Sequence, residues 1–244
     1  MIKNYKKNLE LLTKNHVYCS EMEHDACGVV LIASTEGKKS RAVVEYGIEA
    51  LKAVWHRGAV DADGKTGDGA GIHVEIPKDF FIEKIQVTGH DYDKSEICVG
   101  MIFLPRNDYS SQENCKTIVE SELTKNNFSI YGWRQVPVNP KVLGEKALQT
   151  MPEIIQVLFK PNDLNLVDKE LERKIYETRK KIENKAFNLS LNNFYICSIS
   201  SKSIIYKGKF LAEAISDFFF RFKRQKIYIK ICNFSPKIFN QYCT

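Results

Sequence analysis

The stretch WHRGAVDADGKTGDGAGIHVEIP, residues 55–77, decides between two classes of fold. Its GKT at 64–66 ends like a phosphate-binding P-loop, but a P-loop needs its first glycine five positions before the glycine of GKT. The preceding glycine is Gly58, six positions before. The loop's three aspartates would repel phosphate, and residues 71–76 alternate between apolar and polar side chains, as a strand does and a P-loop helix does not. We therefore interpret the stretch as a glycine-rich loop that leads into a strand.

The apolar pattern on both sides of this stretch predicts a chain that mixes strands with helices. Residues 27–34, CGVVLIAS, form a continuous apolar run, which is typical of a strand buried on both faces. From Ser40 to Trp55 the apolar residues recur at helical spacing. The further predicted strands are 71–76, 96–105, 128–138 and 153–161, with a hairpin at 194–208, and the further predicted helices are 78–85, 111–127, 166–187 and 209–219. This order favours an α+β sandwich over a strictly parallel sheet.

The positive charge of the chain is concentrated at its C-terminal end. The 244 residues carry 36 Lys and Arg against 30 Asp and Glu, a formal net charge of +6. Six of the basic residues lie in 218–244, where no acidic residue occurs, so the rest of the chain carries 30 charges of each sign. Because the body is neutral, the basic excess does not by itself indicate a nucleic-acid partner.

The composition indicates a globular protein of a reducing compartment. Hydrophobic residues make up 43% of the chain, as is ordinary for globular domains. No apolar run reaches the roughly 18 residues of a membrane span, and the N-terminal stretch lacks the apolar centre of a secretory signal. The seven cysteines are scattered without a C-x-x-C pair, which predicts free thiols and no metal site. We therefore expect a cytoplasmic protein with no membrane partner.

Cys27 is the strongest candidate for a reactive residue. It begins the first apolar run, and Gly28 after it leaves the backbone side of the thiol uncovered. The alternative is a core cysteine, because no Cys-His-Asn set is visible and His56 and His73 have no motif that assigns them a role. A cut before Cys27 would place its own α-amine, with a pKa of about 7.7–8.0, beside the sulfur as a base. Residues 1–26 would then be a removable leader.

Three segments together resemble the glutamine amidotransferase domain of the glutamate synthase large subunit. The first two are HDACGVVLIAS at 24–34 and the stretch at 55–77, where HRGA precedes an Asp-rich loop that ends TGDGAG. The third, FYICSISSKSIIYKGKFLAEAISDFF at 194–219, is similar to a later segment of that family. The resemblance covers residues 24–220, and the combination is specific although each piece alone is weak.

This resemblance implies a four-layer αββα N-terminal-nucleophile fold that hydrolyses L-glutamine to glutamate and ammonia. By position, Cys27 becomes the nucleophile and its freed α-amino group the general base, with cleavage after Ala26. The ammonia would pass to the remaining domains or subunits of glutamate synthase, which carry FMN and an iron–sulfur cluster and aminate 2-oxoglutarate reductively. We expect no cofactor in this chain itself. The other motif positions, to which no role is assigned, are Gly28, His56, Arg57, Gly58, Gly67, Asp68 and Gly69.

Residues 221–244 depart from the family pattern. The resemblance predicts a motif close to AIFHQRYSTNT, whose arginine binds the glutamine carboxylate, and then an NG motif whose asparagine is an oxyanion donor. Neither motif occurs here, and the segment reads poorly as strand or helix. However, A/T-rich codons chosen for it and read one nucleotide later encode DLKDKKFILKYAIFHQKYSTNT. We therefore predict a frameshift near residues 218–220 and a partial amidotransferase domain, 27–220, that is incomplete at its C-terminus.

Three functions stay open from the sequence. The first is the glutaminase module of glutamate synthase. The second is a catalytically silent fragment of it, since loss of one oxyanion donor alone costs roughly 100- to 1,000-fold in turnover. The third is a basic module that binds nucleic acid through Arg221 to Lys230, against which the neutral body of the chain argues.

Overall fold

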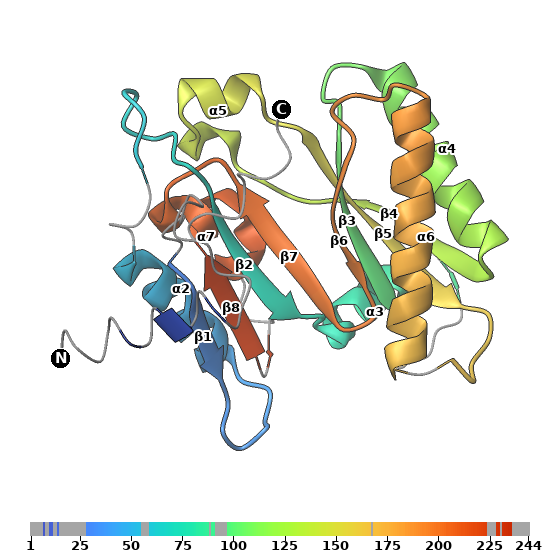
Figure 1. The fold of residues 1–244 in the computed structure, drawn as a ribbon, viewed down its shortest axis with the longest axis horizontal. Helices are drawn as coiled ribbons and strands as arrows, with labels where there is room; N and C mark the ends of the chain where they lie inside the picture. The colour runs from blue at the N-terminus through green and yellow to red at the C-terminus, as the bar shows by residue number, and fades with distance from the viewer. Residues whose placement is uncertain are drawn as a thin grey trace.

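The computed structural model describes residues 28–54, 59–87, 89–90, 97–166, 168–223, 228–229 and 231–235, together with the single positions 7, 10, 11 and 14. These residues form two four-stranded antiparallel sheets with helices packed on them (Figure 1). The strands are β1 (Val30–Ala33), β2 (Ala70–Glu75), β3 (Cys98–Leu104), β4 (Phe128–Gln135), β5 (Glu153–Pro161), β6 (Tyr195–Ser200), β7 (Ser203–Gly208) and β8 (Ile231–Ser235). The helices are α2 (Arg41–Ala53), α3 (Lys78–Gln86), α4 (Tyr109–Lys125), α5 (Glu145–Gln149), α6 (Asp168–Asn188) and α7 (Ile215–Phe218), with 3-10 turns at Pro140–Val142, Ala212–Ala214 and Phe220–Lys223. This mixture confirms the α+β prediction.

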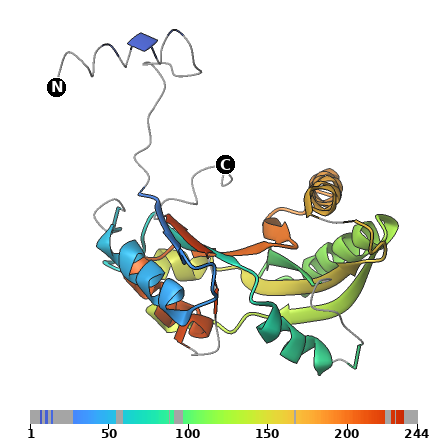
Figure 2. The same cartoon turned by 90° about the horizontal axis from the view of Figure 1, so that it is seen from below.

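The first sheet has the strand order β1-β8-β2-β7. Strand β8 pairs antiparallel with both β1 and β2, so these two strands run in the same direction on either side of it. Val30 of β1 and Ile72 of β2 lie opposite the same residue of β8. Helix α2 covers one side of this sheet (Figure 2).

The second sheet has the order β4-β5-β3-β6, and β3, one of its two central strands, contributes to two cores. Val99, Met101 and Phe103 belong to the core that includes α2, α3 and the first sheet. The alternate residues Ile102 and Leu104 belong to a second core beneath α4 and α6. Since successive side chains of a strand point to opposite faces, β3 contributes to both cores and is buried along its whole length. In Figure 2, α2 lies on one side of the molecule and α4 and α6 on the other.

Local sequence signals account for where α2 and α4 begin. The Ser40 side chain accepts a hydrogen bond from the Ala42 backbone N–H and caps α2. The Asp108 carboxylate caps α4 by accepting from the Ser111 N–H at 3.0 Å and from the Ser111 hydroxyl at 2.6 Å. Such N-caps satisfy donors that a helix leaves unpaired, which is typically worth about 1 kcal/mol.

The predicted hairpin at 194–208 is wrong. Strands β6 and β7 are joined by a tight turn but belong to different sheets, β6 pairing with β3 and β7 with β2. The Glu172 carboxylate of α6 holds the turn by accepting from the Ser201 N–H at 2.7 Å and from the hydroxyls of Ser200 and Ser201. Each strand pairs within its own sheet, so the turn crosses between sheets.

Two predictions about the first sheet also need correction. The run 27–34 was expected to be buried on both faces, but β1 is an edge strand, and Leu31 is 61% exposed because only the alternate side chains pack against the core. The segment 221–244 was expected to lack regular structure, yet 231–235 form β8 between β1 and β2. The predicted frameshift itself stays a prediction.

The other predicted elements are present with shifted ends. The glycine-rich loop leads into β2, as the P-loop reading would not allow. The last predicted helix, 209–219, is shorter than expected and consists of a 3-10 turn followed by α7. No helix in the described part of the chain is long and apolar enough to span a membrane.

Candidate active site

Four of the predicted site residues lie outside the described part of the chain: Cys27, His56, Arg57 and Gly58. The residue directly after Cys27 is Gly28, and the residue directly after Gly58 is Ala59; the structure describes both. These two positions show where the motifs lead in the fold. The first of these, Gly28, is half-buried and leads into β1.

The register of the first sheet brings the two motifs to the same end of it. Since β1 and β2 run in the same direction and Val30 and Ile72 face the same residue of β8, Gly28 and Ala70 hold equivalent places just before or at the start of their strands. Neighbouring strands are about 4.8 Å apart, so two strands separated by one lie roughly 10 Å apart. Ala70 also pairs with Gly208, where β7 ends. We call this edge, formed by Gly28, 69–70 and Gly208, the amino end of the first sheet.

The loop before β2 folds back on itself as a small hairpin, residues 59–68. Val60 and Gly67 form a β-bridge. The Asp68 N–H donates to the Ala59 carbonyl at 3.2 Å, and the Asp68 carboxylate accepts from the Ala59 N–H at 3.0 Å. The tip closes with a hydrogen bond from the Asp61 N–H to the Thr66 carbonyl at 2.9 Å. The hairpin therefore joins the chain after HRG directly to the start of β2.

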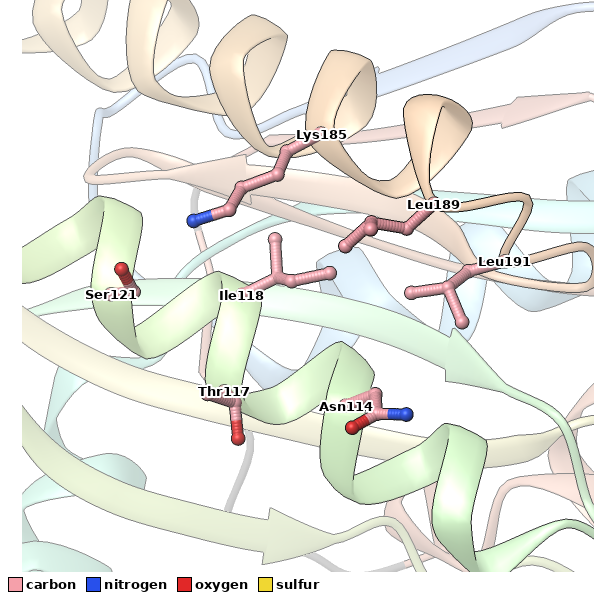
Figure 3. A pocket seen from close by; sticks show the side chains of 7 residues that line it. All are labelled: Asn114, Thr117, Ile118, Ser121, Lys185, Leu189 and Leu191. Atoms are coloured by element: carbon pink, nitrogen blue, oxygen red, sulfur yellow. The ribbon is translucent and has the colours of Figure 1, made fainter.

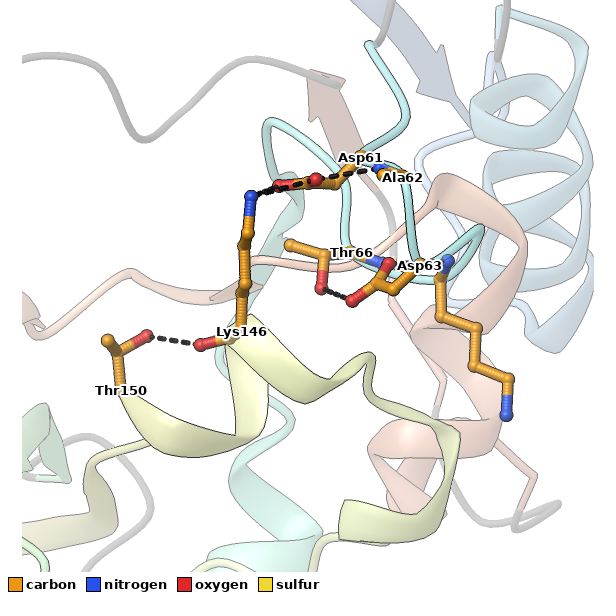
Figure 4. A network of polar contacts seen from close by, with 7 residues as sticks. Asp61, Ala62, Asp63, Thr66, Lys146 and Thr150 are labelled. Atoms are coloured by element: carbon orange, nitrogen blue, oxygen red, sulfur yellow. Dashed lines mark hydrogen bonds and ion pairs between the residues drawn. The ribbon is translucent and has the colours of Figure 1, made fainter.

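Asp63 lies in the part of this hairpin that approaches α5, and Figure 4 shows its hydrogen bond with Thr66. Its carboxylate accepts from the Thr66 hydroxyl at 2.6 Å, the Thr66 N–H at 2.7 Å and the Lys65 N–H at 2.9 Å. The backbone N–H of Glu145, the first residue of α5, adds the smallest of the contributions that lower the pKa of this carboxyl. These donors, the Thr66 hydroxyl first among them, lower the pKa of Asp63 to about 2.

A second contact with α5 comes from the other side of the hairpin. The Lys146 ammonium contacts both carboxylate oxygens of Asp61, at 2.9 and 2.8 Å. This contact lowers the pKa of Asp61 and raises that of Lys146. The Lys146 side chain is 69% exposed and that of Asp61 29%, so solvent screens this pair and it is worth little.

The three described motif positions of the loop lie where the hairpin meets the sheet. Gly67 packs against the backbone of Phe210. Asp68 is half-buried and closes the hairpin through Ala59. Gly69 is buried and has a φ of 123°, in a region that side chains with a Cβ rarely adopt, so the turn into β2 requires glycine. The structure thus brings Gly28, Gly67, Asp68 and Gly69 to the amino end of the first sheet.

His73 and the described cysteines are removed from this end. His73 lies inside β2, and burial lowers its pKa. Burial raises the pKa of Cys115 to about 11 and that of Cys197 to about 12, so both thiols stay protonated at neutral pH. Within the residues that the structure describes, no three His, Cys, Asp or Glu side chains are grouped as metal ligands would be. The described cysteines are dispersed and do not fit an iron–sulfur cluster.

Arg221, a candidate of the nucleic-acid alternative, is not available to a partner. Only 5% of the residue is exposed, and its guanidinium lies 4.0 Å from the ring centroid of Phe80 and 4.7 Å from that of Phe81. One of its nitrogens, Nη1, donates to the Tyr206 hydroxyl. This burial argues against a role in phosphate contacts.

Two hollows of the described surface lie on the second sheet. One, of about 410 Å³, lies between α4 and the end of α6 (Figure 3). Another, of about 560 Å³, adjoins β4 and β5. Neither is lined by Gly28, Gly67, Asp68 or Gly69.

The sequence of this chain matches a known protein family. The profile of the family Glutamine amidotransferases class-II matches residues 27–238. The chain belongs to the class-II glutamine amidotransferases. The match to this family begins at Cys27 and runs past residue 220, through β8. The predicted domain boundaries at 26 and 220 stay predictions.

Relatives of this amidotransferase domain include glutamate synthases. It is 50% identical over 218 residues to the glutamate synthase (NADPH) large chain of Azospirillum brasilense, covering 89% of this chain and 14% of that protein. It is 39% identical over 199 residues to ferredoxin-dependent glutamate synthase 1 of Arabidopsis thaliana, covering 81% and 12%. Against ferredoxin-dependent glutamate synthase 2 of Synechocystis, the identity is 35% over 202 residues, covering 82% and 13%. The chain thus spans about one-seventh to one-eighth of the length of these relatives.

The sequence did not predict the contact between the hairpin and α5. In the sequence analysis, Asp63 only argued against phosphate binding by the loop. The available signal was the spacing of Asp63 and Thr66, three residues apart, which is typical of an aspartate that caps a turn. The partner helix α5 lies some 80 residues further along the chain and has no sequence link to the loop.

Proposed function

We propose that the chain is the glutaminase module of a glutamate synthase, with Cys27 as its nucleophile. The observation that carries the proposal is the register of the first sheet, which sets the residue after Cys27 and the motif residues 67–69 at one edge. The family match supports it by beginning at Cys27. The glutamate synthase relatives support the choice of parent enzyme.

The reaction needs a nucleophile, a base and a water molecule. The Cys27 sulfur attacks the side-chain amide carbon of L-glutamine, and a proton from the thiol passes to the α-amine of a chain that begins at Cys27. The C–N bond breaks, ammonia leaves with that proton, and a glutamyl thioester remains on the sulfur. Water then cleaves the thioester to give glutamate and the free thiol. An α-amine with a pKa of about 7.7–8.0 is suited to this proton transfer at neutral pH.

The remaining parts of the proposal extend beyond the chemistry of this chain. Residues 1–26 are a leader whose removal frees the amine. The two sheets are the inner layers of a four-layer αββα fold, and the helices on opposite sides of the molecule are its outer layers. Ammonia passes to further domains of the synthase, where FMN and an iron–sulfur cluster supply the electrons that reduce 2-oxoglutarate plus ammonia to glutamate. The buried free thiols are suited to a reducing compartment such as the cytoplasm.

Covalent labelling tests the assignment of the nucleophile. The chain is incubated with a chloroketone analogue of L-glutamine, and the modified peptide is identified by mass spectrometry. We expect modification at Cys27 in preference to the other cysteines, and competition by L-glutamine but not by D-glutamine. Cys27→Ser should abolish both the labelling and the release of ammonia from glutamine.

Two results would overturn the assignment. Preferential labelling of Cys98 or Cys115 would move the nucleophile elsewhere. Normal turnover by a chain that still begins at Met1 would exclude the α-amine as base. Labelling of Cys27 without turnover would instead identify a catalytically silent module that still binds glutamine.

A further inference from the structure

The 59–68 hairpin and α5 approach each other so closely that there is no room for a side chain at the contact. A Cβ at Gly144, just before α5, would lie 2.2 Å from the Asp63 carboxylate and 2.3 Å from the Thr66 hydroxyl. Only glycine therefore lets α5 approach the Asp63 carboxylate this closely. Gly144, at the N-cap of α5, has no side chain of its own, and the Asp63 carboxylate occupies the space that a side chain there would fill.

The hairpin transmits this contact to the amino end of the first sheet. Thr66 is buried beneath Asp63, and its carbonyl accepts from the Asp61 N–H. The next residues are Gly67, packed against Phe210, and Asp68, whose carboxylate and N–H both bond to Ala59. A displacement at Asp63 would therefore move Asp68 and the turn into β2.

We propose that Asp63 is a positioning residue of the amidotransferase site, which fixes the 59–68 hairpin on α5 so that residues 67–69 form one wall of the glutamine-binding end of the sheet. This inference rests on the proposed function. It deepens it by assigning glutamine recognition, rather than thiol reactivity, to the loop. Displacement of a binding group by about 1 Å can cost on the order of 100-fold in rate, so the contact has a measurable consequence.

Asp108 provides a matched control within the same chain. Its carboxylate accepts from the N–H and hydroxyl of Ser111, three residues on, as Asp63 does from Thr66. The donors also lower the pKa of both aspartates. Asp108 caps α4 on the second sheet, away from the amino end of the first. Asp108→Asn therefore reproduces the local loss without touching the hairpin.

The experiment compares two alkylation rates at Cys27 in the chain, with the chloroketone glutamine analogue and with iodoacetamide, each followed by peptide mass spectrometry. The ratio of the rates measures glutamine recognition independently of turnover. Asp63→Asn should lower this ratio by about 10-fold or more and leave the iodoacetamide rate within roughly twofold. Asp108→Asn should leave both rates unchanged. Thr66→Ser, which keeps the hydroxyl, should retain the ratio, while Thr66→Val should lower it.

The outcomes separate this inference from the function on which it rests. If the parent chain prefers the analogue and Asp63→Asn keeps that preference, the positioning role is overturned and the glutaminase assignment stands. If the parent chain shows no preference at Cys27, the glutaminase assignment fails and the positioning role fails with it. A ratio that falls equally in Asp63→Asn and Asp108→Asn would show only a general loss of stability and would also overturn the inference.

Discussion

Replacing the buried Arg221 with methionine is expected to make the protein more stable. The residue is 5% exposed, and its Nη2 atom has no hydrogen-bond partner among the described residues. Burial is the main reason why the pKa of the guanidinium is lowered, and the nearby Arg134 adds to the effect. The charge is therefore held where the protein solvates it poorly.

The magnitude follows from the contacts that Arg221 gains and the solvation that it loses. Stacking on Phe80 and Phe81 contributes about 2 kcal/mol, and the charged hydrogen bond to Tyr206 about 1.5–3 kcal/mol. Against this, removing a guanidinium from water costs several kcal/mol, and the orphaned Nη2 about 1–3 kcal/mol more. Methionine would keep most of the volume and pack its sulfur against the same rings. The Tyr206 hydroxyl would keep its contact with the Gln156 amide at 3.3 Å.

We therefore expect Arg221→Met to raise the free energy of unfolding by about 2 kcal/mol, within the range seen when buried charges are replaced by apolar residues. Urea titration should show a higher midpoint with an unchanged slope, and the melting temperature should rise by roughly 4–8 °C. Arg221→Ala, which leaves a cavity, should be less stable than Arg221→Met by about 2 kcal/mol. A loss of more than about 1 kcal/mol in Arg221→Met would refute the reasoning, because it would mean that the stacked charge stabilises the core.

Three further predictions follow from the hairpin and the thiols. Gly144→Ala should destabilise the protein by about 1–3 kcal/mol in thermal unfolding, since its Cβ overlaps the Asp63 carboxylate; unchanged stability would show that α5 can shift freely. Because the pKa of Asp63 is lowered to about 2, its contribution is present above the unfolded-state pKa of about 3.9 and is lost as the pH falls through 2. The stability difference between the parent chain and Asp63→Asn should therefore be constant from pH 5 to 8 and vanish near pH 2, and a difference that persisted there would exclude the carboxylate as its source. Iodoacetamide at pH 8 should leave the four described cysteines unmodified in the folded protein and react with all four in urea, as peptide mapping would show, because burial raises the pKa of each: Cys98, Cys115, Cys197 and Cys232. Rapid labelling of any of them in the folded state would contradict this.

Patterns confined to one element were predictable from the sequence. The stripe after Ser40 and the apolar run around β3 depend on periodicities of 3.6 and 2 residues, which local composition records. The sheet that a strand joins depends on contacts with distant segments of the chain, which local periodicity does not record. Strands β6 and β7 are close in sequence and were predicted to pair, but β6 pairs with β3 and β7 with β2, and Glu172 accepts hydrogen bonds at the turn between them. A tight turn between two apolar runs predicts that their adjoining ends are close in space, but it does not predict that the two strands pair with each other.

In the first sheet, the burial of a strand was equally hard to predict from the sequence. An apolar run predicts that both faces of a strand are buried, but the burial depends on the position of the strand in the sheet. Strand β1 packs only one of its faces against the core, so Leu31 is exposed although its sequence context resembles that of β3, which is buried on both faces. Strand β8 occupies the interior position next to it, from a segment whose sequence gave no strand signal. Position within the sheet, and not apolarity alone, therefore decided burial.

Asp63 and Asp108 show why a candidate site needs the fold as well as the motif. Both aspartates bond the N–H and hydroxyl of the residue three positions on, and from the sequence they are indistinguishable. Asp108 finds its remaining donors in the helix that it begins, so its effect stays local. Asp63 lies against Gly144 at the start of α5, and this distant contact is the one that we propose holds the turn into β2. If the two asparagine variants differ in glutamine recognition but agree in stability, the difference is due to the fold, because the local chemistry of the two sites is the same.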